Sequence, residues 1–202
     1  MAAVIKSDGL FIEPNFLDRH FVARVRREVE QAPQYSTPLQ DLEKRIELET
    51  PPKSRPKSAF DISKDLQNEL EKKISDLKPY IEDFFSLALG NIKIPYYAVY
   101  RQGDFLDRHA DANRSGILHP SAEWTKVAMV IFLNDNNEAG GSDTYEGGNL
   151  TIYGLINNSM FEEFGYPIKG ETGKLVAFRS TCIHEVTPIT RGIRYVVNSG
   201  YY

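Results

Sequence analysis

YRQGDFLDRHAD, residues 100–111, and CIHEVTPITRGIR, residues 182–194, are the two segments from which the fold and the candidate site can best be predicted. The first segment offers His109 and Asp111, two positions apart at the end of a strand-like run, and the second offers His184 at the start of another. Because alternate residues of a strand point to the same face, His109 and Asp111 can reach a common point. We therefore expect the two segments to meet, with the remainder of the chain as their scaffold.

Two imidazoles and one carboxylate are the donor set that holds a non-haem Fe(II) on one face and leaves the opposite coordination positions open. We interpret His109, Asp111 and His184 as candidate metal ligands on this ground. The HxD pair alone is weak evidence, because His and Asp meet at this spacing by chance in many proteins and are more often a surface pair. The arginine downstream of His184 strengthens the interpretation.

Arg194 lies in a strand-like segment, residues 193–199, in which alternation places Arg194, Val196 and Asn198 on one face. If that face looks into a barrel, the guanidinium is buried and needs an anionic partner, because an unpaired buried charge costs on the order of several kcal/mol. No acidic residue occupies the alternate positions, so the sequence predicts a dicarboxylate ligand held in bidentate fashion. The alternative is an outward-facing arginine on an edge strand.

Composition limits the class of protein. With 202 residues, 41% of them hydrophobic and 11% aromatic, the chain is expected to form one soluble globular domain. A net charge of −4 gives no electrostatic reason to expect nucleic acid or an anionic membrane as a partner. The single cysteine, Cys182, cannot form an internal disulfide, and neither a signal peptide nor a membrane span is evident. We therefore predict a cytoplasmic protein.

The first half of the chain has helical periodicity. One amphipathic helix is predicted to begin at Leu17-Asp18 and to end before Pro33, and a second to begin near residues 61–63. Pro79 is expected to restart that second helix, which continues to Gly90. Residues 34–57, rich in Pro and charge, are predicted to form a long loop; a surface loop with a short helical piece and a lid over the substrate are equally good interpretations.

The second half has the pattern of a β-protein. Short β-branched or aromatic runs are separated by Gly, Asn and Asp clusters, which favours an antiparallel sandwich or jelly roll. The predicted strands are residues 94–101, 124–134, 148–153, 174–179, 183–188 and 193–199. The predicted fold class is α+β, mainly β: a double-stranded β-helix, or jelly roll, with supporting N-terminal helices on one sheet. We expect a single domain over residues 1–202, with helical support and the candidate lid in residues 1–90 and the catalytic core in residues 91–202.

Taken together, these motifs resemble those of the Fe(II)- and 2-oxoglutarate-dependent dioxygenases. The resemblance rests on Tyr100 before His109, on GDF before the HxD, on EGGNLTIY at residues 146–153 and on HEVTPITRGIR at residues 184–194. Within these enzymes the chain is most similar to the prolyl 4-hydroxylase-like branch. The likeness covers residues 96–199, about half of the chain.

The resemblance implies a role for individual residues. His109, Asp111 and His184 match the metal ligands of the family. Arg194 matches the residue that forms a salt bridge with the distal carboxylate of 2-oxoglutarate, and Tyr100 matches a phenol that often hydrogen-bonds the same ligand. The carboxylate at Asp111 favours hydroxylation over halogenation, because a small residue there would leave room for a halide.

Two weaker candidates for the 2-oxoglutarate pocket are Thr190 and Asn198. The resemblance also implies that Fe(II) is the cofactor and that 2-oxoglutarate and O2 are cosubstrates, with ascorbate as a further candidate reductant. The expected reaction is hydroxylation of an unactivated C–H bond with release of succinate and CO2. An arginine at position 194, where collagen-type enzymes often have lysine, points to the non-collagen members.

The identity of the substrate is left open between three alternatives. The first is a prolyl residue in a protein or peptide, which the branch resemblance and the candidate lid favour. The second is a free amino acid or another small molecule, which would require a narrower pocket. The third is a non-catalytic jelly-roll binding module, against which the complete set of ligands argues.

Overall fold

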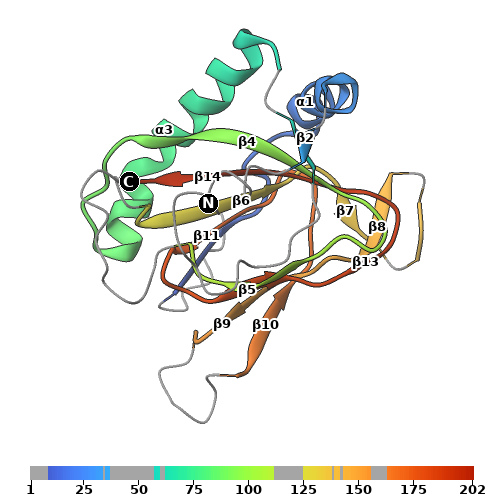
Figure 1. The fold of residues 1–202 in the computed structure, drawn as a ribbon. Coiled ribbons are helices and arrows are strands. Elements are labelled where there is room, and N and C mark those ends of the chain that lie inside the picture. Colours follow the sequence, from blue (N-terminus) through green and yellow to red (C-terminus); the bar gives the residue numbers. More distant parts are fainter. Residues whose placement is uncertain are drawn as a thin grey trace.

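The computed structural model describes residues 9–33, 35–36, 57–59, 62–111, 125–137, 139–141, 143–155 and 163–202. In these residues the predicted jelly roll is confirmed: a seven-stranded sheet, in the order β1-β11-β6-β14-β4-β3-β2, faces a four-stranded sheet, in the order β10-β9-β12-β5. A further small sheet, β13-β8-β7, lies at one end of the molecule (Figure 1). All strand pairs are antiparallel except β7 with β8.

The strands are short, as the spacing of turn residues in the sequence predicts. Their bounds are β1 (Leu10–Glu13), β2 (Tyr35–Ser36), β3 (Lys57–Ala59), β4 (Ile92–Tyr100), β5 (Leu106–His109), β6 (Val127–Phe132), β7 (Asp135–Asn136), β8 (Thr144–Gly147), β9 (Leu150–Tyr153), β10 (Gly165–Ile168), β11 (Leu175–Arg179), β12 (His184–Val186), β13 (Ile189–Arg191) and β14 (Arg194–Tyr201).

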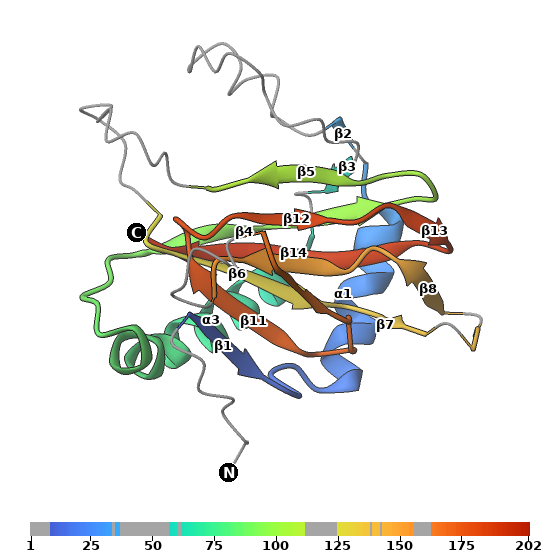
Figure 2. The same ribbon diagram turned by 90° about the horizontal axis from the view of Figure 1, so that it is seen from below.

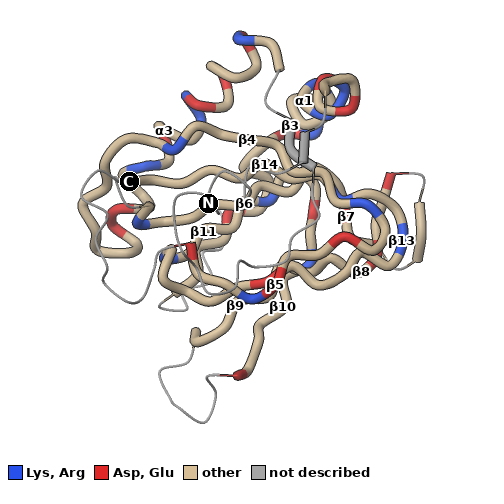
Figure 3. Tube along the Cα trace, viewed as in Figure 1, with Lys and Arg blue, Asp and Glu red and all other residues tan. Residues whose placement is uncertain are grey.

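Helices α1 (Arg19–Gln31) and α3 (Lys64–Phe85) cover the outer face of the large sheet (Figures 1 and 2). Helix α1 begins where predicted, because the Asp18 side chain accepts a hydrogen bond from the backbone N–H of Phe21 at 2.8 Å and so caps the first turn. Its apolar stripe, with Val25 and Val29 fully buried, packs in one cluster with the helix-facing residues of the sheet. Charged residues are frequent along the two helices, whereas the central strands carry few (Figure 3).

Helix α3 differs from the prediction, because Pro79 lies inside one continuous helix and does not begin a second one. A proline within a helix removes a backbone hydrogen bond and costs about 3 kcal/mol. Burial of Ile74 before it, and of Ile81 and Phe85 after it, holds the helix against the sheet on both sides. The helix ends at Ser86, which has a left-handed conformation with φ of 51°, and not at Gly90.

A second hydrophobic core lies between the two sheets. Strand β14 contributes side chains to this core and to the core under the helices. Tyr195 and Val197 belong to the helix-side cluster, whereas Val196 belongs to the cluster between the sheets. Arg194 and Asn198 share the inner face with Val196, since all three line the same pocket or core. The predicted alternation of this strand is therefore confirmed.

The N-terminal part of the chain contributes more to the sheet than expected. Strand β1 pairs with β11, and β2 and β3 extend the large sheet beyond β4, so residues 1–90 are not purely helical support. Strand β10 is not among the strands predicted from the sequence. The candidate lid lies mostly outside the described residues. No helix in the described part of the chain is both long and apolar enough to cross a bilayer.

The packing of α3 against the sheet leads to a prediction about stability. Leu70 is completely buried, so Leu70→Ala should lower the free energy of unfolding by about 2–5 kcal/mol, through lost burial and the cavity left behind. Tyr80→Ala, at a position on the same helix that is 67% exposed, should change it by less than about 0.5 kcal/mol. Urea unfolding followed by circular dichroism measures both. Equal losses would contradict the assignment of the buried face.

Candidate metal centre

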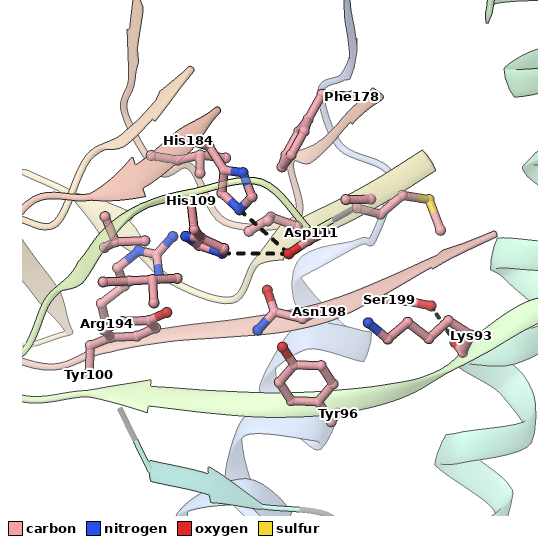
Figure 4. Close-up of a pocket in the computed structure, with 16 residues that line it drawn as sticks. Lys93, Tyr96, Tyr100, His109, Asp111, Phe178, His184, Arg194, Asn198 and Ser199 are labelled. Atoms are coloured by element: carbon pink, nitrogen blue, oxygen red, sulfur yellow. Dashed lines mark hydrogen bonds and ion pairs between the residues drawn. The ribbon is translucent and has the colours of Figure 1, made fainter. Parts of the chain in front are cut away.

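His109, Asp111 and His184 meet between the two sheets. His109 is the last residue of β5 and pairs in register with His184, the first residue of β12, so that their ring centroids lie 4.2 Å apart. The Asp111 Oδ1 atom lies 3.5 Å from His109 Nε2 and 4.0 Å from His184 Nε2 (Figure 4). One ligand atom from each residue falls within 4.8 Å of the others, which is close enough for all three to bind one ion.

Asp111 reaches this cluster in a different way from the one expected. Strand β5 ends at His109, and Asp111 lies in the bend that follows, so the two side chains do not converge by strand alternation. The carboxylate remains 31% exposed, whereas His184 is buried. The cluster therefore has one open side, on which Asp111 sits.

Backbone carbonyls orient both imidazoles. His109 Nδ1 lies 2.8 Å from the carbonyl oxygen of Asp107, and His184 Nδ1 lies 3.2 Å from that of Cys182. A carbonyl only accepts, so each Nδ1 carries a proton, and each Nε2 is the ring atom that faces Asp111 and binds a metal once it carries no proton. Two such nitrogens and a carboxylate are the donors of a facial Fe(II) site, and these residues fit that metal.

The electrostatics of the cluster keep His184 and Asp111 in forms that bind metal, whereas the pKa of His109 is raised, because the effect of burial is outweighed by the hydrogen bond and charge of Asp111. Burial lowers the pKa of His184 to about 4, so this imidazole is neutral at neutral pH. Burial acts to raise the pKa of Asp111, but the hydrogen bond from His109 and the charges of His184, His109 and Lys93 outweigh it and lower that pKa to about 2. A neutral imidazole and an ionised carboxylate are the forms that coordinate a divalent cation.

Arg194 lies in the same pocket and lacks partners for part of its guanidinium. The residue is 1% exposed, and its Nε and Nη1 atoms have no hydrogen-bond acceptor within the described residues. The Tyr100 and Phe132 rings lie 4.8 and 5.3 Å from its Cζ atom. A buried cation with free donors is costly unless an anion completes the site, so the pocket fits a carboxylate ligand.

A second tyrosine near this guanidinium was not identified from the sequence. The Tyr145 hydroxyl is buried and forms no hydrogen bond of good geometry with the described residues; burial raises its pKa, while the charge of Arg194 and its weak contacts with the Arg194 guanidinium and the Gly170 backbone act to lower it. A phenol and a guanidinium whose contact is this weak can both donate to one carboxylate. In the sequence, Tyr145 is marked only by its position directly before EGG at residues 146–148. Strand alternation in β8 alone does not predict that its side chain points toward Arg194.

Gly148 makes room for the stem of Arg194. It has a φ of +58°, and a Cβ atom there would lie 2.2 Å from Ile189 Cδ1 and 3.1 Å from Arg194 Cδ. The structure places Gly148 against the side chains of Ile189 and Arg194. Both the turn conformation and the close approach require glycine at this position.

Comparison with known proteins identifies the family. The profile of the 2OG-Fe(II) oxygenase superfamily matches residues 95–202, which is more than half of the chain and includes the three clustered ligands and Arg194. The chain belongs to the 2OG-Fe(II) oxygenase superfamily. This membership confirms the resemblance drawn from the motifs, and the family uses Fe(II) and 2-oxoglutarate.

Relatives within the superfamily are hydroxylases. The PKHD-type hydroxylase YbiX of Shigella boydii is 32% identical over 115 residues, which are 55% of this chain and 44% of the relative. A PKHD-type hydroxylase of Pseudomonas putida is also 32% identical, over 114 residues, or 45% of its length. The match thus spans less than half the length of these curated relatives.

Solved structures with the same fold include prolyl hydroxylases. A prolyl 4-hydroxylase from Pseudomonas putida superposes with a TM-score of 0.66 at 20% identity, covering 96% of this chain and 91% of that one. A prolyl hydroxylase from Trichoplax adhaerens, in complex with a hypoxia inducible factor peptide fragment, gives a TM-score of 0.71 at 20% identity, covering 96% and 84%. At this identity the likeness supports the fold.

Not every residue expected in the 2OG-Fe(II) oxygenase site lies there. Tyr100 and Asn198 line the pocket, and Asn198 is paired in register with Tyr96, a second pocket residue. Thr190 does not: it is exposed on β13 and is absent from the pocket lining, because β13 belongs to the small end sheet. Thr190 is therefore not positioned to bind a ligand in this pocket.

Proposed function

We propose that this chain is a 2-oxoglutarate-dependent dioxygenase that hydroxylates a prolyl residue of a protein or peptide and releases succinate and CO2. The observation that carries the proposal is the presence, in one pocket, of a His-Asp-His cluster and a buried guanidinium with free donors. The first is the donor set for Fe(II), and the second is a site for a dicarboxylate.

Each residue has a distinct part in this proposal. His109, Asp111 and His184 would hold the iron, and Arg194 with Tyr145 would bind the distal carboxylate of 2-oxoglutarate. With iron, 2-oxoglutarate and O2 bound, the centre supplies oxidative decarboxylation coupled to hydroxylation of a C–H bond. Tyr100 packs its ring against the guanidinium and so helps to fix its orientation.

Apolar side chains separate the metal cluster from the arginine. Leu106, Leu150 and Val186 all line the pocket, and Val186 is the cross-strand partner of the other two. Val186 comes two residues after His184 on β12, and the chain continues to Ile189, whose side chain lies near Arg194. Such a lining excludes water from the space that the cosubstrate would fill and strengthens its contact with the guanidinium.

Two observations support a protein or peptide as the substrate. Prolyl hydroxylases share the fold, and one of them is described in complex with a peptide fragment. The metal cluster is also open on the side of Asp111, which leaves an approach for a large substrate. A single domain, a cytoplasmic location and a response to ascorbate remain predictions from the sequence and the family.

The test is the formation of succinate by the purified protein with Fe(II), O2 and 2-oxoglutarate. Proline-containing peptides should stimulate succinate formation and gain one oxygen atom on proline, measured by mass spectrometry. Stimulation by free amino acids alone would contradict the peptide assignment. Absence of succinate under every condition would favour a binding module.

The unpartnered Tyr145 hydroxyl gives a specific prediction about 2-oxoglutarate. Tyr145→Phe should weaken its binding by about 10- to 100-fold, because a hydrogen bond to a charged group contributes about 1.5–3 kcal/mol. Stability without 2-oxoglutarate should not fall, since the lost hydroxyl had no partner among the described residues. Calorimetric titration and thermal unfolding measure the two effects.

Tyr97→Phe is the matched control, because Tyr97 is equally buried but faces the helices. Its hydroxyl donates to Gln67 Oε1 at 3.1 Å. This variant should lose about 1 kcal/mol of stability and bind 2-oxoglutarate normally. Weaker 2-oxoglutarate binding in both variants would show that the effect is not specific to the pocket.

A further inference from the structure

The end of the pocket away from Arg194 contains a second cation, Lys93. It lies on β4, is half-buried, and its side chain runs along the pocket with the ammonium directed toward Asn198 (Figure 4). The backbone there is fixed, because the Ser199 hydroxyl donates to the Lys93 carbonyl oxygen at 2.7 Å. Lys93 therefore extends from a strand whose backbone is fixed by hydrogen bonds, and not from a loop.

The Lys93 ammonium has no assigned partner. Within the described ranges, no hydrogen bond or ion pair reaches it, although its charge acts on Asp111 from a longer distance. The lysines that serve the fold are different: Lys174 binds Glu171, and Lys126 donates to the Ala88 carbonyl oxygen at 2.7 Å. Among the residues that the structure describes, Lys93 therefore has no structural contact that explains a cation inside the pocket.

With Fe(II) and 2-oxoglutarate bound, the charges in the pocket would sum to one positive charge, that of Lys93. The charged side chains that line the pocket are Lys93, Asp111 and Arg194, and the two imidazoles coordinate a metal in their neutral form. Bound Fe(II) and the dianion of 2-oxoglutarate cancel each other, and Asp111 cancels one of the two cations. Since Arg194 would be neutralised directly by the distal carboxylate, the remaining positive charge is that of Lys93, at the end left for the substrate.

We propose that Lys93 binds a carboxylate of the substrate and so selects an acidic substrate for this site. This proposal rests on the proposed function, because the Lys93 end of the pocket is left for the substrate only if 2-oxoglutarate binds at the Arg194 end. Tyr96 and Asn198, paired across β4 and β14, line the pocket beside the Lys93 ammonium (Figure 4). A carboxylate held at Lys93 would place neighbouring atoms of the same molecule over these two residues and near the cluster.

The carboxylate can come from an acidic side chain near the target proline or from the α-carboxylate of a chain end or free amino acid. The probes are acetylated, amidated peptides with a central proline, in which one glutamate is moved along the sequence, each matched by a glutamine version. N-acetylproline and its amide form the second arm. Dissociation constants are measured by calorimetry on the anaerobic protein with Fe(II) and 2-oxoglutarate, and succinate formation is measured in air.

We expect at least one acidic probe to bind about tenfold more tightly than its neutral match. Lys93→Met should abolish this preference, and Lys93→Glu should reverse it in favour of a lysine-containing peptide. The dissociation constant of 2-oxoglutarate should stay within about twofold in both variants. Lys72→Met, at an exposed position on α3 paired with Asp76, is the control and should keep the preference.

The two arms assign the source of the carboxylate. A preference in the glutamate series alone indicates a side chain, and a preference for N-acetylproline alone indicates an α-carboxylate. Equal binding of acidic and neutral probes, binding of neither, or a preference that survives in Lys93→Met would overturn the proposal. Weaker 2-oxoglutarate binding in Lys93→Met would overturn it as well, by assigning the lysine to the cosubstrate. Failure of the proposed function is distinguishable, since the unmodified protein would then form no succinate with any probe.

Discussion

Arg194→Met should weaken the binding of 2-oxoglutarate by about 30-fold to several thousand-fold, because loss of one partner of a buried charge pair costs about 2–5 kcal/mol. The same substitution should leave the protein without 2-oxoglutarate equally stable or more stable. The guanidinium is 1% exposed and two of its nitrogens have no partner among the described residues, so its removal relieves an unpaired buried charge. Calorimetric titration gives the affinity, and thermal unfolding with and without 2-oxoglutarate gives the stability.

Arg191→Met is the matched control for this prediction. Arg191 lies three residues upstream, is 53% exposed and pairs with Glu146 at the surface, so both affinity and stability should change little. Arg194→Lys should fall between the two, because an ammonium keeps the charge but not the bidentate geometry. A large loss of stability in Arg194→Met together with normal 2-oxoglutarate binding would give Arg194 a purely structural role.

Asp111→Ala should reduce the affinity for Fe(II) by more than about 100-fold and abolish succinate formation. Even substitutions that only orient metal ligands cost about 10- to 100-fold, and this one removes a ligand itself. The fold should persist, because the carboxylate is partly exposed and belongs to a bend after β5. Metal content after dialysis, measured by mass spectrometry, and circular dichroism test the two statements.

The control for Asp111 is Asp143→Ala, which removes a surface carboxylate paired with Arg26. It should retain metal and activity. Full metal binding in Asp111→Ala would contradict the role of this carboxylate, and loss of the circular dichroism signal would show that the residue is needed for folding. The design thus separates a ligand from a structural residue.

The sequence was sufficient to predict the fold class because periodicity changes once, from helical to strand-like, near Gly90. The capped start of α1 and the two-faced pattern of β14 depend on local residues, and both are confirmed. What failed depends on tertiary packing. The continuous helix through Pro79 exists because the sheet supports both halves, and β10 exists because β9 offers it an edge.

The residues of the site also separate into those that the sequence predicts and those that depend on tertiary packing. The three candidate ligands and Arg194 were found from residue type and spacing, since the chemistry of iron and of a dicarboxylate allows few alternatives. Tyr145 and Lys93 were not identified from the sequence, because what singles them out is the lack of a close polar partner among the described residues, and this depends on the tertiary structure. Thr190, a weaker candidate that followed from the family resemblance, lies on β13, which belongs to another sheet.

The central claim is that His109, Asp111 and His184 hold one iron to which 2-oxoglutarate binds. The most direct measurement is the visible spectrum of the anaerobic protein with Fe(II) and 2-oxoglutarate, in which chelation by the keto acid gives a weak charge-transfer band. We predict that the band forms in the unmodified protein, requires both additions and is absent from His184→Ala. No band in the unmodified protein, or an unchanged band in His184→Ala, would contradict the account.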